Sequence, residues 1–219
     1  MKPHHHIDSS TMLGYAAGAL PTAFRVVVEA HLAICSWCRT QWMDANRIGG
    51  HLLDQQEGAP LPPGWREAVL ARLTETGPAV PRPEEPVAMT HDPDRLPEPL
   101  WPYFGERFSD LRWRLIGPGV HHIQAPQVND GKLMLLRIAP GRSVPLHSHG
   151  GNELTLVLQG AYDDSLGHFA PGDVADLDGD VEHQPVTSPG VPCICLAATD
   201  QPLRFSGWLA RALQPLFNF

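Results

Sequence analysis

Two separate groups of metal-binding side chains constrain this 219-residue chain more than any other feature of its sequence. The amino-terminal group combines imidazole and thiolate donors, namely His31, Cys35 and Cys38. The carboxy-terminal group combines imidazoles with a carboxylate, namely His147, His149, Glu153 and His183. A Cys/His group usually builds a closed structural zinc site, whereas a His/Glu group can hold a metal with an open position. Two ligand chemistries therefore predict two modules.

Composition predicts a soluble globular protein, with 42% hydrophobic and 18% charged residues and no apolar run long enough to span a bilayer. Met1 to Ser10 contain no apolar segment of the secretory type, so we expect a cytoplasmic protein without a membrane anchor. The formal net charge of −8 argues against direct binding to nucleic acid. Residues 1–76 carry six Lys/Arg and seven Asp/Glu, and this nearly neutral part suits a protein partner better.

Residues 9–76 have the pattern of about four helices, which predicts a small bundle. Asp8 or Ser9 can cap a first helix that ends near Gly18, and Pro21 can open a second whose apolar face includes Val26–Val28. A third helix is expected over about residues 35–48. A fourth is expected over about residues 64–76, where apolar side chains recur every four residues: Trp65, Val69 and Leu73.

Residues 77–102 contain eight prolines mixed with acidic residues. Proline removes a backbone donor and fixes φ, so this segment predicts an extended, semi-rigid linker without helix or central strand. We place the domain boundary here, between residues 1–76 and residues 103–219.

After residue 102 the chain changes to short apolar or alternating runs broken by Gly, Pro and Asp, which is typical of an all-β barrel or sandwich. The expected strands are Arg112 to Ile116, Val120 to Gln124, Lys132 to Ala139, Leu154 to Leu158, Val181 to Val186 and Cys193 to Ala198. A closing helix is expected over residues 207–216.

The amino-terminal donors can converge without a long loop. His31 and Cys35 are four residues apart and share a helix face, and Cys38 follows one turn later. The fourth ligand must come from elsewhere, and His6 is the best candidate, with His5 and His4 behind it. Alternatively, the cysteines are buried small side chains and His31 lies at the surface, or the CxxC is redox-active, although that would require a βαβ context.

The carboxy-terminal group lies in a stretch from Gly141 to Gly160 that resembles the first motif of the cupin family. His147 and His149 point the same way along one strand, and Glu153 follows the Gly150-Gly151 turn, so all three can face a barrel interior. The second motif is more degenerate, with His183 as its expected ligand. Donor spacing leaves Zn²⁺, Mn²⁺, Fe²⁺ and Ni²⁺ open, as well as an empty barrel lined by histidines.

The two halves together resemble a known family of regulators. His6, then Tyr15-Ala16-Ala17-Gly18, then His31-x3-Cys35-x2-Cys38 is similar to the zinc-binding anti-sigma domain. Followed by a single cupin domain, the chain resembles the ChrR-type anti-sigma factors. This resemblance implies zinc ligated by His6, His31, Cys35 and Cys38, zinc in the cupin domain, and an extracytoplasmic-function sigma factor as partner, released under singlet-oxygen or related stress.

Several further side chains stay open in their role. Arg137, Tyr162 and Asp164 could face the barrel interior, but ordinary strand or turn positions are expected for them. His121, His122 and His168 are expected at the surface or in strand pairing. Cys193 and Cys195 share one strand face, either as packing residues or as an oxidation-sensitive pair.

The leading hypothesis is therefore an anti-sigma factor that is not an enzyme. Apolar side chains of the bundle, including Leu13, Leu20, Phe24 and Val28, would cover the sigma factor. The main alternative is a cupin dioxygenase or isomerase with a zinc-stabilised helical appendage. A third is a small-molecule-binding regulator without a sigma factor, and the oligomeric state stays open.

Overall fold

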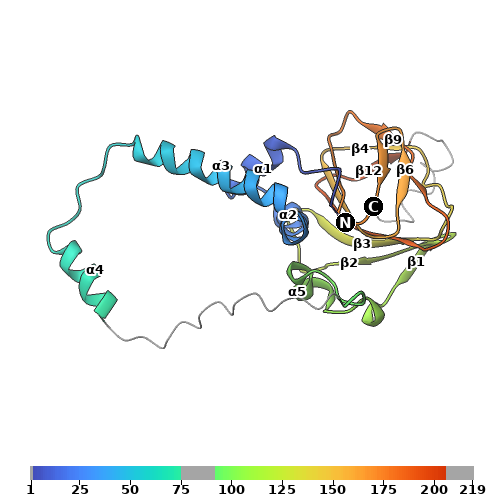
Figure 1. The fold of residues 1–219 in the computed structure, drawn as a ribbon, viewed down its shortest axis with the longest axis horizontal. Coiled ribbons are helices and arrows are strands. Elements are labelled where there is room, and N and C mark those ends of the chain that lie inside the picture. Colours follow the sequence, from blue (N-terminus) through green and yellow to red (C-terminus); the bar gives the residue numbers. More distant parts are fainter. Residues whose placement is uncertain (1, 75–91, 206–219) are drawn as a thin grey trace. The chain divides into compact units, whose positions relative to one another are not determined.

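The computed structural model describes residues 2–74 and 92–205 (Figure 1). Contacts divide the chain into two compact units, one with residues 1–49 and 94–219 and one with residues 50–93. The first two helices thus belong to the same unit as the strands, whereas the division at residues 76 and 102 stays a prediction. Within the described ranges, no helix has the length and apolar character needed to cross a bilayer.

Four helices occupy the amino-terminal part, as predicted: α1 (Ser9–Ala16), α2 (Thr22–Ile34), α3 (Ser36–Asp54) and α4 (Trp65–Thr74). Asp8 caps α1, because its carboxylate accepts the main-chain N–H of Ser10 at 2.8 Å. Pro21 precedes α2, which stays helical through its β-branched run because packing outweighs intrinsic propensity. Cys35 has extended backbone (φ −98°, ψ 109°), and this residue separates α2 from α3.

The apolar face of α2 packs on the β-sheet. Its contacts are with the strands β11, β5 and β3, whose bounds follow below, and Ala23, Val27 and Val28 are completely buried. Burying each such valine contributes about 1.5–3 kcal/mol. The expectation of a self-contained helical bundle is therefore wrong for α2. The reason is that α1, with eight residues and Met12 alone buried, is too small to cover this face.

From residue 114 on, the described part of the first unit is a β-structure whose paired strands are all antiparallel. The order is β1-β2-β3-β11-β5-β8 in the main sheet, with two three-stranded sheets, β10-β6-β7 and β12-β4-β9. The strands are β1 (Arg114–Gly117), β2 (Val120–Gln124), β3 (Lys132–Ile138), β4 (His147–His149), β5 (Glu153–Gln159), β6 (Tyr162–Asp164), β7 (Gly167–Phe169), β8 (Val174–Leu177), β9 (Glu182–His183), β10 (Val186–Thr187), β11 (Cys193–Thr199) and β12 (Leu203–Phe205).

Five of the six predicted strands are present with shifts of a residue or two at their ends. The predicted strand Val181 to Val186 is wrong, because it is divided into β9 and β10 around Pro185, which has no N–H to donate. Strands β6, β7 and β8 escaped prediction, since three or four residues with polar members give no clear alternation. The predicted closing helix lies outside the described residues.

The end of the predicted linker is folded. Glu98–Leu100 forms the 3-10 helix η1, and α5 (Trp101–Phe104) follows it, with a second 3-10 helix, η2 (Phe108–Asp110), further on. The expectation that residues 77–102 exclude helix is therefore wrong here. Proline is tolerated at the first positions of both short helices, and Leu96 and Leu100 are buried, with η1 in contact with α2.

Candidate metal centres

The amino-terminal donors come together from four places in the chain. His6 precedes α1, His31 lies in the last turn of α2, Cys35 joins α2 to α3, and Cys38 lies in the first turn of α3. One donor atom from each lies within 4.8 Å of the others. His31 Nε2 is 3.1 Å from Cys38 Sγ, and His6 Nδ1 is 3.4 Å from Cys35 Sγ. His6 is thus the histidine of the upstream run that joins the group.

Burial sets the protonation state of these side chains in the metal-free protein. The Nδ1 atom of His31 lies 2.9 Å from the carbonyl oxygen of Gly172, which can only accept, so Nδ1 carries the hydrogen and Nε2 keeps its lone pair. Burial lowers the pKa of His31 to about 4, so the ring is neutral at pH 7. Burial also raises the pKa of the Cys38 thiol to about 11 in the metal-free protein. Two thiol and two imidazole donors fit a tetrahedral Zn²⁺.

The carboxy-terminal histidines form a second group. His147 and His149 lie on β4 and His183 on β9, and the pairing of these strands sets His147 opposite His183. All three rings are buried, and one ring nitrogen from each lies within 4.8 Å of the others. The Nε2 atoms of His149 and His183 are 3.2 Å apart. Three converging imidazoles suit a divalent transition metal without selecting which one.

Each of these histidines has an oxygen atom close to its other ring nitrogen, although His149 Nδ1 makes no hydrogen bond by geometry. His147 Nδ1 is 2.8 Å from the carbonyl oxygen of Pro145, and His183 Nδ1 is 2.9 Å from Asp164 Oδ2. His149 Nδ1 is 3.0 Å from Glu153 Oε2. Such outer contacts orient a ring and leave Nε2 for the metal.

Glu153 lies beside the three-histidine group rather than in it. Thr155 donates its hydroxyl to Glu153 Oε1 at 2.8 Å, while the other oxygen faces His149. Burial opposes ionisation of this carboxyl, but contacts with His149, His147 and Thr155 hold its pKa below the ordinary value. A small movement of the Glu153 side chain would be enough to make its carboxylate a fourth ligand. Direct ligation by Glu153 therefore stays a prediction.

The structure assigns a place to three of the side chains whose role the sequence left open. Asp164 faces inward, with its side chain completely buried against His183. Tyr162 is also buried, and burial raises its pKa above the ordinary range. His168 is exposed and pairs with Asp163. Asp164 is the functional contact that the sequence undervalued, because its partner lies on a strand 19 residues away.

Cys193 and Cys195 are free thiols in the buried face of β11. Their sulfur atoms are 3.5 Å apart, and Cys193, Cys195, Tyr162 and Phe169 belong to one apolar cluster. The hydrogen bond with Cys193, together with burial, raises the pKa of Cys195. Packing accounts for both side chains, and a redox role stays a prediction.

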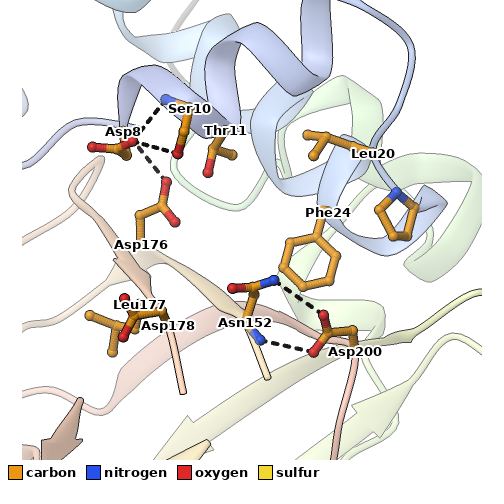
Figure 2. A pocket seen from close by; sticks show the side chains of 11 residues that line it. Asp8, Ser10, Thr11, Leu20, Phe24, Asn152, Asp176, Leu177, Asp178 and Asp200 are labelled. Atoms are coloured by element: carbon orange, nitrogen blue, oxygen red, sulfur yellow. Dashed lines mark hydrogen bonds between the residues drawn. The ribbon is translucent and has the colours of Figure 1, made fainter. Parts of the chain in front are cut away.

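A cavity of about 470 Å³ lies where α1 and α2 meet the sheet. Its lining includes Asp8, Asp176, Asp178 and Asp200, which are labelled in Figure 2. Asp176 accepts the main-chain N–H of Asp8 at 3.0 Å, and Asp200 accepts that of Asn152 at 2.9 Å. The Asp8 carboxylate accepts the main-chain N–H of Ser10 and thereby caps α1. These contacts fasten main-chain segments together, so the cavity is a structural junction.

Comparison with known proteins relates this chain to a family of regulators. Residues 104–202 match the family described as the ChrR Cupin-like domain. Over 218 residues, and the full length of both proteins, the chain is 41% identical to the anti-sigma-E factor ChrR of Cereibacter sphaeroides. The chain belongs to the ChrR-type anti-sigma factors. An anti-sigma factor is a regulator rather than an enzyme, so this membership sets aside the cupin-enzyme alternative.

A solved structure supports this membership over both halves of the chain. The crystal structure of Rhodobacter sphaeroides SigE in complex with the anti-sigma ChrR contains a chain that is 36% identical. The match covers 91% of this ChrR-type chain and 100% of that chain, with a TM-score of 0.73. The match thus extends over most of the chain and is not confined to the β-structure.

Proposed function

We propose that this chain binds an extracytoplasmic-function sigma factor in the cytoplasm and keeps it from RNA polymerase. Membership of the ChrR-type anti-sigma factors carries this proposal. The helices support it as well, because several of their large apolar side chains are exposed in the chain on its own. A sigma factor is a protein partner of the kind that covers such a surface.

Exposed apolar side chains lie on α3 and, separately, on α4, whereas the apolar face of α2 is buried. Those on α3 are Trp37, Trp42, Met43, Ile48, Leu52 and Leu53. On α4 they are Trp65, Val69, Leu70 and Leu73. Of the four side chains predicted to cover the sigma factor, Leu13 is about half exposed and Leu20 is partly buried, but Phe24 and Val28 are buried. The prediction was wrong for Phe24 and Val28 because the β-sheet occupies that face of α2.

Large aromatic and aliphatic residues on an unpaired helix face are the usual anchors of a helix-in-groove interface. Trp65, Val69 and Leu73 are spaced by four residues and form one face of α4. Removing an anchor of this kind costs about 2 kcal/mol or more, which is roughly 30-fold in affinity.

Co-expression with the sigma factor of the same genome tests the proposal. We expect a stable complex by size exclusion, weakened at least tenfold by Trp65→Ala. Arg66→Ala is the matched control, because this neighbour on α4 is exposed and polar. Failure of the full chain to bind any sigma factor of this class would contradict the proposal.

We infer that the amino-terminal group holds Zn²⁺ through His6, His31, Cys35 and Cys38. The donor set and its convergence support this inference. Bound zinc would tie the segment before α1 to the junction of α2 and α3. Zinc would thereby contribute to the folding free energy of helices with few buried side chains of their own.

We further propose that the cupin part senses the oxidative signal that releases the sigma factor, with a metal held by His147, His149 and His183. The buried, oriented imidazoles support metal binding there. Glu153→Ala tests the sensing role, because it removes the partner of His149 without removing a histidine. We expect this variant to bind the sigma factor normally but to release less of it under singlet oxygen. Unchanged release would contradict a sensing role.

A further inference from the structure

The turn between β7 and β8, residues 170–173, lies outside both groups of metal donors but touches the amino-terminal group. The carbonyl oxygen of Gly172 accepts the Nδ1 hydrogen of His31 at 2.9 Å, across 141 residues of sequence. The His31 side chain and Gly172 are both buried. One ligand of the helical part is therefore oriented by the main chain of the β-structure.

The neighbouring residue, Asp173, supports the segment that carries His6. Its Oδ1 atom accepts the main-chain N–H groups of His4 at 2.6 Å and His5 at 3.0 Å. Its Oδ2 atom accepts that of Ala170 at 2.8 Å, which closes the turn on itself. The carbonyl oxygen of His5 in turn accepts the N–H of Val174 at 3.2 Å. The two residues before His6 are thus hydrogen-bonded to this turn and the start of β8.

The same turn is anchored in the β-structure. Gly172 N–H donates to the carbonyl oxygen of Val157 on β5 at 2.8 Å, and Val157 N–H donates to that of Asp173 at 3.0 Å. Strand β5 begins at Glu153, the partner of His149. The Phe169 ring lies between the His5 ring, at 4.1 Å, and the Tyr162 ring, at 4.9 Å between centroids. The turn therefore links the cupin interior to the His6 segment.

We propose that this turn is the outer support of the Cys/His group, so that the cupin part determines how tightly the helical part retains zinc. The proposal rests on the zinc occupancy inferred above. Gly172 fixes the donor nitrogen of His31, and Asp173 positions the main chain before His6. Outer partners of this kind typically change metal affinity 10- to 100-fold.

The test uses the full chain loaded with Co²⁺, whose thiolate charge-transfer absorption reports on the cysteine-containing group and not on the three histidines. Affinity is measured by competition with a chelator. We expect Asp173→Ala to lower the affinity 10- to 100-fold. Asp173→Asn should lie between this variant and the parent, because its amide oxygen still accepts His4 and His5 while its nitrogen cannot accept Ala170.

Asp130→Ala is the matched control. Asp130 also accepts a main-chain N–H across the helix–sheet junction, that of Thr22 at 2.7 Å, but touches no donor of the group. We expect its cobalt affinity to equal that of the parent. In the metal-stripped chains, the amides of residues 4–8 should exchange faster in both Asp173 variants and remain protected in the control.

The outcomes separate this proposal from the one beneath it. A parent chain without the thiolate band would overturn the zinc assignment and this proposal together. A parent with the band, and Asp173 variants that match it in affinity and exchange, would overturn the support role alone. Equal losses in the Asp130 control would also overturn it, since the effect would then be one of general stability.

Discussion

At two glycines of the cupin motif the backbone is the same but the surroundings differ. Gly141 and Gly160 have φ values of +67° and +68°. A Cβ atom on Gly141 would meet nothing within 4 Å, whereas one on Gly160 would lie 2.5 Å from the carbonyl oxygen of Pro192. Both substitutions carry the cost of a left-handed conformation, about 1 kcal/mol, but at Gly160 a close main-chain contact adds to it.

Gly160→Ala should therefore lower the free energy of unfolding by about 3 kcal/mol, and Gly141→Ala by about 1 kcal/mol. Urea unfolding of both variants measures the difference. Equal losses would show that the main chain around Pro192 relaxes freely.

Asp164 supplies a second residue-scale prediction. Its buried carboxylate accepts the Nδ1 hydrogen of His183, whereas asparagine can accept it only through a neutral amide oxygen and lacks the negative charge that makes the ring a stronger ligand. Asp164→Asn should lower metal affinity at the three-histidine group about 10- to 100-fold. The measurement is metal competition in the full chain, with Asp163→Asn on the exposed side of β6 as control. No loss in Asp164→Asn would mean that His183 is oriented without it.

Donors could be read from the sequence, but their supports could not. Cys35, Cys38, His147 and His149 stand at spacings that a helix turn or a strand explains. The contacts of His183 with Asp164 and of His31 with Gly172 join segments 19 and 141 residues apart, and one of them uses a main-chain carbonyl. Neither leaves a pattern in the sequence.

At the scale of elements, α2 is the helix that joins the two kinds of structure. Its first turn has no side-chain cap from Pro21, and Asp130, on the loop between β2 and β3, supplies one instead. Asp130 accepts both the main-chain N–H and the hydroxyl of Thr22. This cap from a distant loop holds α2 against the sheet.

Asp130→Ala should cost about 1 kcal/mol of unfolding free energy at pH 7. The Thr22 N–H holds the pKa of Asp130 below its ordinary value of 3.8, so the cap contributes above pH 4 and is lost as the pH falls through the folded-state pKa. The gap between variant and parent should therefore close below about pH 4. Unfolding measured between pH 7 and pH 3 tests this, and a constant gap would contradict the role of the charged form.

Element type was predictable where the periodic pattern was long, and not where pairing made the element. The helices of residues 9–74 and the strands at β2, β3, β5 and β11 follow from apolar periodicity and caps. The placement of α2 on the sheet could not be predicted from the sequence. An apolar helix face indicates that it is covered, but it does not indicate which element covers it. Strands of two or three residues exist only through their partners.

At the scale of the whole molecule, the helices contribute in two ways to one function. The apolar face of α2 is buried against the β-structure, whereas α3 and α4 have large apolar side chains that are exposed. The sequence predicted that the helical part binds a partner, but it wrongly included Phe24 and Val28 of α2 in the binding surface. Charge and composition argued against nucleic acid and membranes as partners, but they could not show which helix face the sheet covers.

The most direct test is transcription from a promoter that depends on the sigma factor, reconstituted with core RNA polymerase and titrated with the zinc-loaded full chain. The account predicts that transcription falls to background near an equimolar ratio of chain to sigma factor. Trp65→Ala should require a several-fold excess, while Arg66→Ala should behave as the parent. Undiminished transcription at a large excess of zinc-loaded chain would contradict the account.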